Sequence, residues 1–290
     1  MLQKDSVSIR IVIPSRYQST RLPGKPLIKI AGVELVKRVA GIASLVCEVC
    51  GDCDFVVATD DARIFEFCEN SGLPVLMTRA DCANGTERCW DAVINKSSER
   101  KFEPKLVINM QGDNPLCPPH VIRALIESWR VNSGVDLFTP SVRLSWEEFD
   151  GIIETKKSTP YSGTTVLVDR NNFALAFSKA VIPVVRDIVK AKKLLSMSPV
   201  CRHVGVYAYT FGALRRYVEL APSDYELSCV EGLEQMRFLE NGMRIKVVPV
   251  DYGGQETTGG VDSPEDIERV EAIIAKYGDP YKQSVTIHGN

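Results

Sequence analysis

This sequence lacks any apolar run as long as the roughly 18 to 20 residues that a membrane-spanning helix needs. Its first ten residues, MLQKDSVSIR, also lack the apolar core of a signal peptide. The formal net charge is only -2, so the sequence lacks the charge excess of a protein that binds nucleic acid or an anionic membrane over a broad surface. We therefore expect a soluble, cytoplasmic globular protein with no nucleic-acid or membrane partner, in which any anion site is local.

The cysteines do not form an even-numbered set. There are nine, scattered among predicted strands and helices, which fits reduced thiols better than a disulfide framework. Cys47, Cys50 and Cys53 have the spacing Cys-x2-Cys-x2-Cys, which could suit zinc or an iron–sulfur cluster. Because no fourth ligand follows as the cluster pattern requires, we favour the alternative of a helix end and a turn.

Two common phosphate-binding motifs are also missing. No G-x-G-x-x-G follows the first predicted strand, which excludes a Rossmann dehydrogenase, and no Gly-Lys-Ser/Thr ending marks a P-loop. Instead the strand over 8–14 runs into a basic loop that carries Arg16, Arg21 and Lys25. Cations in a loop are most often simply solvated, so this loop alone does not establish an anion site.

Strands and helices alternate in the first part of the chain. The apolar pattern predicts strands over 8–14, 54–60, 74–78 and 105–113, and helices over 34–46, 62–72, 85–96 and 120–131. This order is typical of β-α-β units and a parallel sheet, in which ligands bind at the carboxyl ends of the strands. The polar residues that follow these strands should therefore converge on one cleft: Arg16, Asp60, Arg79 and Asp113.

The pattern changes after about residue 118, where we expect an α+β insertion that packs onto the first unit. Predicted strands cover 136–144, 164–179 with a hairpin turn at 169–172, 203–211 and 244–250, and a helix covers 230–242. The last helix starts at Ser263 and Pro264, with Asp266 completing a capping box. The tail, 279–290, has no periodic pattern and is expected to be frayed.

Two acids are predicted to reach the same edge of the sheet as the basic loop. Asp113 ends the stretch MQGD, and Asp262 precedes the last helix. A single Asp after a strand is more often a turn former than a ligand, but acids and cations together suit a polyanion and a divalent metal. Mg²⁺ commonly takes one or two carboxylates plus substrate phosphates. The combination favours phosphoryl or nucleotidyl transfer, which depends on positioning and charge stabilisation.

Seven stretches resemble one known family. They are IPSRYQSTRLPGKPL, VVATDD, MTRADCANGTER, NMQGDNPL, RHVGVYAY, LEQMRFLENG and GVDSPEDIERVE. In this order they closely resemble the 3-deoxy-manno-octulosonate (Kdo) cytidylyltransferase, or CMP-Kdo synthetase, family over residues 7–275. The resemblance implies a homodimer that uses CTP, the acidic 3-deoxy sugar Kdo and Mg²⁺ to make CMP-Kdo and pyrophosphate for lipopolysaccharide synthesis.

The resemblance also implies a fold and its division. The fold would be α/β: a nucleotide-diphospho-sugar transferase fold, with a mainly parallel Rossmann-like sheet flanked by helices and an α+β dimerisation insertion. Residues 1–118 and 228–278 would form the nucleotide-binding α/β domain. Residues 119–227 would form the sugar-binding and dimerisation subdomain, followed by the tail 279–290.

The family assigns roles to individual residues. Asp113 and Asp262 would bind Mg²⁺ and, with Arg16 and Lys25, would be catalytic. The nucleotide would be bound by Ser15, Arg16, Arg21, Lys25, Thr78, Arg79, Gly85, Thr86 and Gln111. The sugar would be bound by Gln111, Lys179, His203, Tyr207, Glu231 and Gln235. The even spacing of His203 and Tyr207 puts them on one face of a strand, and the spacing of Glu231 and Gln235 puts them on one face of a helix.

Some positions depart from the family pattern, mostly toward the sugar. Asn114 replaces a usual glutamate, Lys179 a usual arginine and Thr165 a usual lysine, while the usual Pro-Leu-Glu before the glutamate helix reads DYELSC, with Ser228 and a shifted acid at Glu226. The sugar could therefore be Kdo, an 8-amino analogue or another ulosonic acid such as a sialic acid. A non-catalytic nucleotide-binding regulator is the rival class, but it would be expected to lose a metal acid.

Overall fold

The computed structural model describes residues 7–18, 22–94, 103–253 and 260–282. Arg21, the end of the predicted helix 85–96 and the tail beyond residue 282 lie outside the described residues. The strands are β1 (Ile9–Pro14), β2 (Lys29–Ile30), β3 (Val33–Glu34), β4 (Cys53–Thr59), β5 (Val75–Met77), β6 (Leu106–Met110), β7 (Leu137–Arg143), β8 (Thr165–Val168), β9 (Ala174–Ser178), β10 (Cys201–His203), β11 (Val206–Thr210) and β12 (Ile245–Pro249).

The helices match most of the predicted ones. They are α1 (Leu35–Cys50), α2 (Ala62–Asn70), α3 (Gly85–Ile94), α4 (Pro119–Val131), α5 (Trp146–Ser158), α6 (Ile188–Leu194), α7 (Phe211–Glu219), α8 (Met236–Glu240) and α9 (Pro264–Tyr277). Three short 3-10 turns add η1 (Lys25–Leu27), η2 (Asp224–Glu226) and η3 (Pro280–Lys282).

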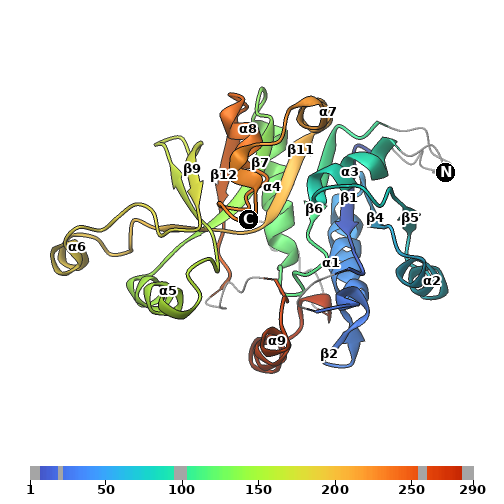
Figure 1. Ribbon diagram of the computed structural model, residues 1–290, viewed down its shortest axis with the longest axis horizontal. Coiled ribbons are helices and arrows are strands. Elements are labelled where there is room, and N and C mark those ends of the chain that lie inside the picture. The colour runs from blue at the N-terminus through green and yellow to red at the C-terminus, as the bar shows by residue number, and fades with distance from the viewer. Residues whose placement is uncertain (1–6, 19–21, 95–102, 254–259, 283–290) are drawn as a thin grey trace.

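One large sheet organises the molecule (Figure 1). Its strand order is β5-β4-β1-β6-β11-β7-β10-β8-β9, and β12 pairs with β7. Strands β5, β4, β1, β6, β7 and β12 run in one direction, because β11 is antiparallel to both β6 and β7. The central sheet is therefore mainly parallel, as predicted, and the ends of β1, β4, β5 and β6 meet at one edge.

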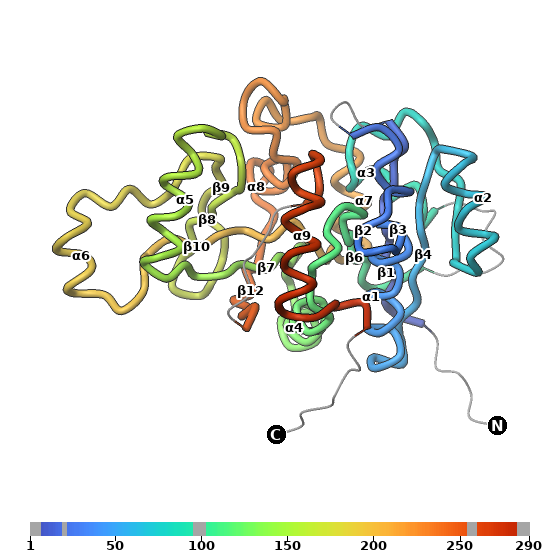
Figure 2. Tube along the Cα trace, turned by 90° about the horizontal axis from the view of Figure 1, so that it is seen from below, coloured from blue at the N-terminus to red at the C-terminus, as the bar shows by residue number. Residues whose placement is uncertain are grey.

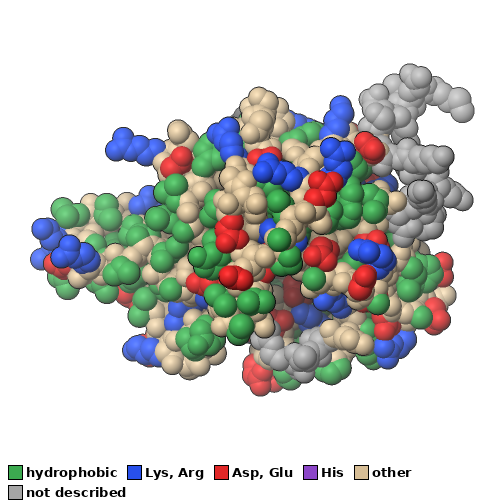
Figure 3. All heavy atoms as spheres, turned by 45° about the horizontal axis from the view of Figure 1, so that its top comes forward, with side chains coloured by type: hydrophobic (Ala, Val, Ile, Leu, Met, Phe, Trp, Pro, Cys, Tyr) green, Lys and Arg blue, Asp and Glu red, His purple; other side chains and the backbone are tan. Residues whose placement is uncertain are grey.

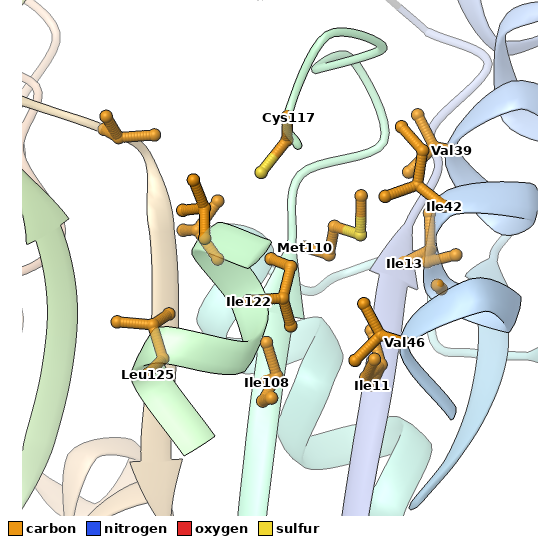
Figure 4. Close-up of a cluster of buried hydrophobic side chains, with 14 of the residues drawn as sticks. Ile11, Ile13, Val39, Ile42, Val46, Ile108, Met110, Cys117, Ile122 and Leu125 are labelled. Carbon is orange, nitrogen blue, oxygen red and sulfur yellow. The ribbon is translucent and has the colours of Figure 1, made fainter. Parts of the chain in front are cut away.

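Helices cover both faces of this sheet. On one face, α1 and α4 pack against β1 and β6, with Ile11, Ile42, Ile108 and Ile122 in one buried cluster (Figure 4). Helix α1 buries its apolar residues at three- and four-residue spacing, which fits an amphipathic helix on a sheet. On the opposite face, α3, α7 and α8 cover a second cluster. This layering leaves the edge at the strand ends as the place for a site.

Beyond the central sheet, β8, β9, α5 and α6 form an arm. Figures 1 and 2 both place α6 at one end of the molecule and α2 at the other. A small separate core under α5 contains Leu144, Phe149 and Val200. Figure 3 shows hydrophobic side chains exposed along this arm, with basic side chains at its tip. Strands β8 and β9 bury Val166 and Phe177 in the second cluster, whereas α6 has no buried residue.

Three sequence predictions are wrong in detail. The strand predicted over 203–211 is two strands, β10 and β11, because the chain makes a tight turn at Gly205 in which the Val206 amide donates to the Val204 carbonyl at 2.7 Å. The helix predicted over 230–242 is reduced to α8. The tail is not frayed over 279–282: Pro280 is buried and Asp279 pairs with Arg38.

The predicted domain boundary does not coincide with a gap in the sheet. Strands β7 and β11 belong to the predicted insertion, yet β11 pairs with β6 and β7 pairs with β12 of the predicted nucleotide-binding domain. The sheet is therefore continuous across the two proposed units, and their separate roles stay a prediction.

The three-cysteine stretch closes the C-terminal end of α1. Cys47 and Cys53 have their sulfurs 3.1 Å apart, and Gly51 makes the turn between them. All nine cysteines are free. No group of three or more His, Cys, Asp or Glu in the described residues could hold a metal ion. None of the described helices is long and apolar enough to cross a membrane.

Candidate active site

Lys25, Asp113 and Asp262 form a compact ion cluster at the carboxyl edge of the sheet. The Lys25 ammonium lies 2.8 Å from Asp113 Oδ2 and 3.1 Å from Asp262 Oδ1. Only 14% of the Lys25 side chain is exposed, against 30% and 39% for the two acids. Three residues that sequence reasoning assigned to one site therefore meet there, although they come from distant parts of the chain.

The basic loop is shaped before it reaches Lys25. Gly24 has a positive φ of 68°, and a side chain there would start 3.1 Å from the Tyr17 ring. Arg63 stacks its guanidinium on the same ring, 3.3 Å from the centroid. Only glycine adopts this conformation without strain next to an aromatic ring, so Gly24 fixes the turn that starts η1 at Lys25.

A backbone contact holds the two acids together. The Val261 amide donates to the Asp113 carbonyl at 2.9 Å, and a Cβ at Gly260 would lie 2.8 Å from the Asp113 carboxyl. Asp266, in the first turn of α9, accepts from the amides of Asp262 and Ser263 at 2.9 Å. The predicted capping box is confirmed, and it fixes the direction from which Asp262 enters the site.

The cluster suits a divalent cation. Burial is the largest influence on the pKa of Lys25 and lowers it, but attraction and hydrogen bonds from Asp113, then Asp262, outweigh it and leave that pKa above its ordinary value. Two carboxylates that together stabilise one cation offer the hard oxygen atoms that Mg²⁺ prefers. Gly260 leaves the Asp113 carboxyl the space that a larger residue would fill. The donor set therefore fits Mg²⁺.

Arg16 lies in a neighbouring group of charges. Its guanidinium donates to the Cys82 carbonyl at 2.6 Å. Burial and the nearby charge of Arg88 lower its pKa, while Asp60 and Glu234 oppose this. Asp60 itself pairs with the fully buried Arg88 at 3.0 Å. The expectation that Arg16 and Asp60 converge is confirmed, but Asp60 is already used to neutralise a buried arginine.

The predicted nucleotide-binding residues differ in burial and in the contacts that they make. Gly85, at the start of α3, faces Gln111, since a Cβ there would lie 3.4 Å from the Gln111 amide nitrogen. Arg79, in contrast, pairs with Asp91 at 3.1 Å and has 62% of its side chain exposed. Ser15 and Thr78 are buried, and the Thr78 hydroxyl accepts from Arg88 at 2.6 Å.

Thr86 is buried beneath this edge of the sheet. Its hydroxyl bonds to the Tyr209 hydroxyl at 2.8 Å and donates to Glu234 at 3.0 Å. Burial raises the pKa of Glu234, and the Thr86 bonds counteract this. Because the hydroxyl already has protein partners on both sides, Thr86 positions Glu234 and Tyr209.

His203, Tyr207 and Gln235 form a buried polar row next to the cluster. The ring centroids of His203 and Tyr207 are 5.5 Å apart, so the two are neighbours even though a turn separates their strands. His203 Nε2 bonds to the Thr139 hydroxyl at 2.8 Å, and the Tyr207 hydroxyl donates to Gln235 at 3.1 Å. The Gln235 amide nitrogen is buried without a hydrogen-bond partner in the described residues, which is rare for a buried donor.

Lys179 and Glu231 meet beside this row, but not as predicted. Glu231 accepts from the Ser178 hydroxyl at 2.9 Å and the Lys179 amide at 2.7 Å. Burial lowers the pKa of Lys179, opposed by the charges of Glu231 and Asp262. Neither Glu231 nor Gln235 lies in a helix, so the expected shared helical face is wrong. Glu231 instead accepts hydrogen bonds at the end of β9. Lys179 follows this strand and lies close enough to Asp262 for that charge to act on its pKa.

Comparison with known proteins agrees with this geometry. Residues 10–245 match the family model described as cytidylyltransferase. A 3-deoxy-manno-octulosonate cytidylyltransferase from Maricaulis maris (strain MCS10) is 42% identical over 94% of this chain and 99% of its own. The chain belongs to the 3-deoxy-manno-octulosonate cytidylyltransferase family. A mitochondrial enzyme of the same name from Arabidopsis thaliana is 34% identical over 91% of this chain and 82% of its own.

A solved structure extends the comparison to the fold. It is that of CMP:2-keto-3-deoxy-manno-octonic acid synthetase complexed with CTP, and it matches with a TM-score of 0.76 and 32% identity. The match covers 92% of this chain and 98% of that one. A 4-diphosphocytidyl-2C-methyl-D-erythritol synthase from Anaerococcus prevotii DSM 20548 shares the fold alone, at 11% identity and a TM-score of 0.54.

Sequence reasoning missed two residues of this cytidylyltransferase site. Glu234 faces Thr86 and Arg16, and it lies in LEQMRFLENG, one of the stretches that carried the resemblance. Thr139, from β7, holds His203 and also donates to the Val206 carbonyl at 2.8 Å. Glu234 could have been suspected from its place beside Gln235, whereas nothing in the sequence around Thr139 indicates its role.

Two of the family departures have structural uses in this cytidylyltransferase. The Thr165 hydroxyl donates to the Ala180 carbonyl at 2.7 Å and accepts from the Ile182 amide at 3.1 Å, so it fixes the loop after Lys179. Glu226 pairs with Arg237 and caps η2. Both side chains are therefore used in structural contacts, whereas the positive charge of Lys179 acts on His203 in the polar row and lowers its pKa.

Proposed function

We propose that this protein transfers the cytidylyl group of CTP to the anomeric hydroxyl of 3-deoxy-manno-octulosonate, giving CMP-Kdo and pyrophosphate. The observation that supports this best is the cluster of Lys25, Asp113 and Asp262 at the strand-end edge of a cytidylyltransferase fold. The names of the relatives supply the nucleotide and the sugar.

In this reaction the sugar hydroxyl oxygen bonds to the α-phosphorus as the bond from that phosphorus to the β-phosphate oxygen breaks. Negative charge then grows on the departing pyrophosphate. Lys25 and Arg16 are positioned to neutralise this charge, because both lie at one edge of the sheet and are partly shielded from water. No residue needs to form a covalent intermediate, so the protein contributes positioning and charge stabilisation.

We propose that Asp113 and Asp262 hold Mg²⁺, which fits their oxygen donors. When bound, Mg²⁺ would supply Lewis-acid stabilisation of the phosphate oxygens and lower the pKa of the attacking hydroxyl. The sugar would be held by the Gln235 amide, by Lys179 for its carboxylate, and by the row of Tyr207 and His203. Lys179 offers a point charge and not the two-pronged contact of an arginine.

The setting of the reaction is also a proposal. Nine free cysteines and a CTP substrate suit the reducing, nucleotide-rich cytoplasm. The product would be consumed in lipopolysaccharide synthesis. The exposed apolar arm suits a homodimer, because an obligate partner would bury surface that the described chain leaves open.

The test is pyrophosphate release from CTP with Mg²⁺ and purified protein, with Kdo, 8-amino-Kdo and sialic acid assayed in parallel. Turnover should be fastest with Kdo, and Asp113→Ala should reduce it by about a thousandfold or more while leaving the circular dichroism spectrum unchanged. Asp224→Ala, which removes an exposed acid from η2, is the control and should remain active. Turnover with none of the sugars, or near-normal turnover by Asp113→Ala, would sink the proposal.

A further inference from the structure

Lys25 occupies the place between the two proposed metal acids. Its ammonium bonds to both, at 2.8 and 3.1 Å, and is mostly shielded from water. We propose that Lys25 is the built-in counter-ion of Asp113 and Asp262, and that a divalent cation must displace it to bind. This inference rests on the proposed Mg²⁺ site and assigns Lys25 a second task besides binding phosphate.

Charge balance explains why a counter-ion is needed. Two carboxylates held within a few ångströms repel each other, and this repulsion grows when they are partly shielded from water. The Val261 amide and the close fit of Gly260 hold the backbone of Asp113 against the segment of Asp262, so the two acids stay neighbours. One ammonium between them removes most of this repulsion in the metal-free protein.

The same ammonium disfavours metal binding to the free protein. A divalent cation that approaches both carboxylates meets a positive charge that already holds their oxygens. To make room, Lys25 must leave both acids, and a mostly buried ammonium without a partner is costly. Its backbone is fixed by the turn at Gly24 and by η1, so only the side chain can swing away.

A bound triphosphate would give the displaced ammonium a new partner. Metal binding and nucleotide binding are then coupled, and linkage requires that each strengthens the other by the same factor. The free protein should bind divalent cations weakly, and the metal should enter with the nucleotide. Lys25 thereby couples the binding of the metal to the binding of the nucleotide.

Titration of the nucleotide-free protein with Mn²⁺, followed by the electron paramagnetic resonance signal of free Mn²⁺, tests this directly. Lys25→Met removes the charge and keeps the length of the side chain, and it should bind Mn²⁺ about tenfold more tightly than the unchanged protein. Lys25→Arg keeps the charge and should bind Mn²⁺ no more tightly. Asp113→Asn should bind Mn²⁺ weakly, both alone and in combination with Lys25→Met.

Thermal unfolding provides a second readout that does not depend on turnover. Without metal, Lys25→Met should unfold at a lower temperature than the unchanged protein, since its acids repel. Added Mn²⁺ should raise its unfolding temperature by more than it raises that of the unchanged protein. Lys25→Gln, which can still donate to one acid, replaces Lys25→Met in both measurements if that variant does not fold.

The coupling is measured through CTP binding in the absence of sugar. Mn²⁺ should strengthen CTP binding by a larger factor in the unchanged protein than in Lys25→Met, because only the unchanged protein must release an ammonium. Equal Mn²⁺ affinities in Lys25→Met and the unchanged protein would overturn the inference and leave the metal site standing. Absence of Mn²⁺ binding from every variant, with or without CTP, would overturn the metal site and the inference together.

Discussion

His203 illustrates how the environment of a single side chain limits its chemistry. Its ring contacts Phe177 and Tyr207, and its Nε2 bonds to the Thr139 hydroxyl. Burial, aided by the positive charge of Lys179, lowers the pKa of His203 from 6.5 to about 3. The imidazole is therefore neutral near pH 7, so it serves as a hydrogen-bonding group in the polar row and not as a charge for the sugar carboxylate.

This buried histidine predicts a pH dependence of stability. Its folded-state pKa lies below the unfolded value, so the unfolded chain binds a proton that the folded chain does not. The free energy of unfolding should therefore fall as pH drops from 6.5 toward 3, by about 1.4 kcal/mol per pH unit for this one group. Above pH 6.5 this contribution is complete.

His203→Gln keeps an amide that can bond to Thr139 but cannot titrate. Urea unfolding of both proteins between pH 5 and 6.5, above the range of most carboxylates, isolates the difference. The unchanged protein should lose stability faster than the variant as pH falls. Parallel stability profiles would show that His203 titrates normally in the folded protein.

Some site residues could be predicted from the sequence and others could not. Lys25, Asp113 and Asp262 were predictable as one cluster, because each follows or precedes an element whose end lies at the same edge of the sheet. Arg79 also follows a strand, yet Asp91 from α3 draws it aside. The pairing of acidic and basic side chains depends on distances in the folded chain. Neither hydrophobic periodicity nor a short motif predicts these distances.

Among the helices and strands, capping and turn motifs predicted the structure correctly where no tertiary contact opposed them. Helix α9 begins as its capping box predicted, and the turn at 169–172 joins β8 to β9. The helix predicted over 230–242 failed because Gly232 takes a positive φ of 63° and its amide bonds back to the Leu227 carbonyl. That turn places Glu234 and Gln235 in the site, so tertiary contacts override the helical periodicity here.

Gly260, in the segment before α9, is the site of a substitution that should lower activity more than stability. In Gly260→Ala the new methyl group would start 2.8 Å from the Asp113 carboxyl and must displace it from its present position. Since a shift of about 1 Å at a reacting centre costs up to a hundredfold, kcat should fall by about ten- to a hundredfold.

The matched control is Gly212→Ala in α7, where nothing lies within 4 Å of the added carbon. This variant should keep normal kcat and gain slightly in stability, because alanine favours a helix. Steady-state kinetics and thermal unfolding of both variants are the measurements. Equal kcat for the two variants would mean that Gly260 does not constrain Asp113.

The whole molecule is asymmetric, with a closed core at one end and an open arm at the other (Figures 1 and 2). The parallel pairing of the first strands followed from alternating strand and helix signals. The arm could not be predicted in this way, because its exposed apolar residues show no strand or helix periodicity. They include Val184 at 79%, Val189 at 69% and Leu194 at 71% exposure.

A second copy of the chain is the proposed partner for this arm. Val189→Glu together with Leu194→Glu should weaken self-association by about a hundredfold or more, because both carboxylates would be buried in the interface. Sedimentation velocity should then show a monomer where the unchanged protein is a dimer. Val131→Glu, at an equally exposed position on α4 with 80% exposure, should leave the dimer intact. An unchanged sedimentation coefficient in the double variant would exclude the arm as the interface.

The position of Asp262 in the chain also has a consequence for biosynthesis. Lys25 and Asp113 are translated early, but the second acid arrives just before α9, which docks on the loop of the β2–β3 hairpin through Glu271 and the Ala31 amide. A nascent chain can therefore form the parallel half of the sheet with Lys25 bound to one acid only. The ribosome must translate the chain through Asp262 before the proposed metal-binding pair of acids is complete.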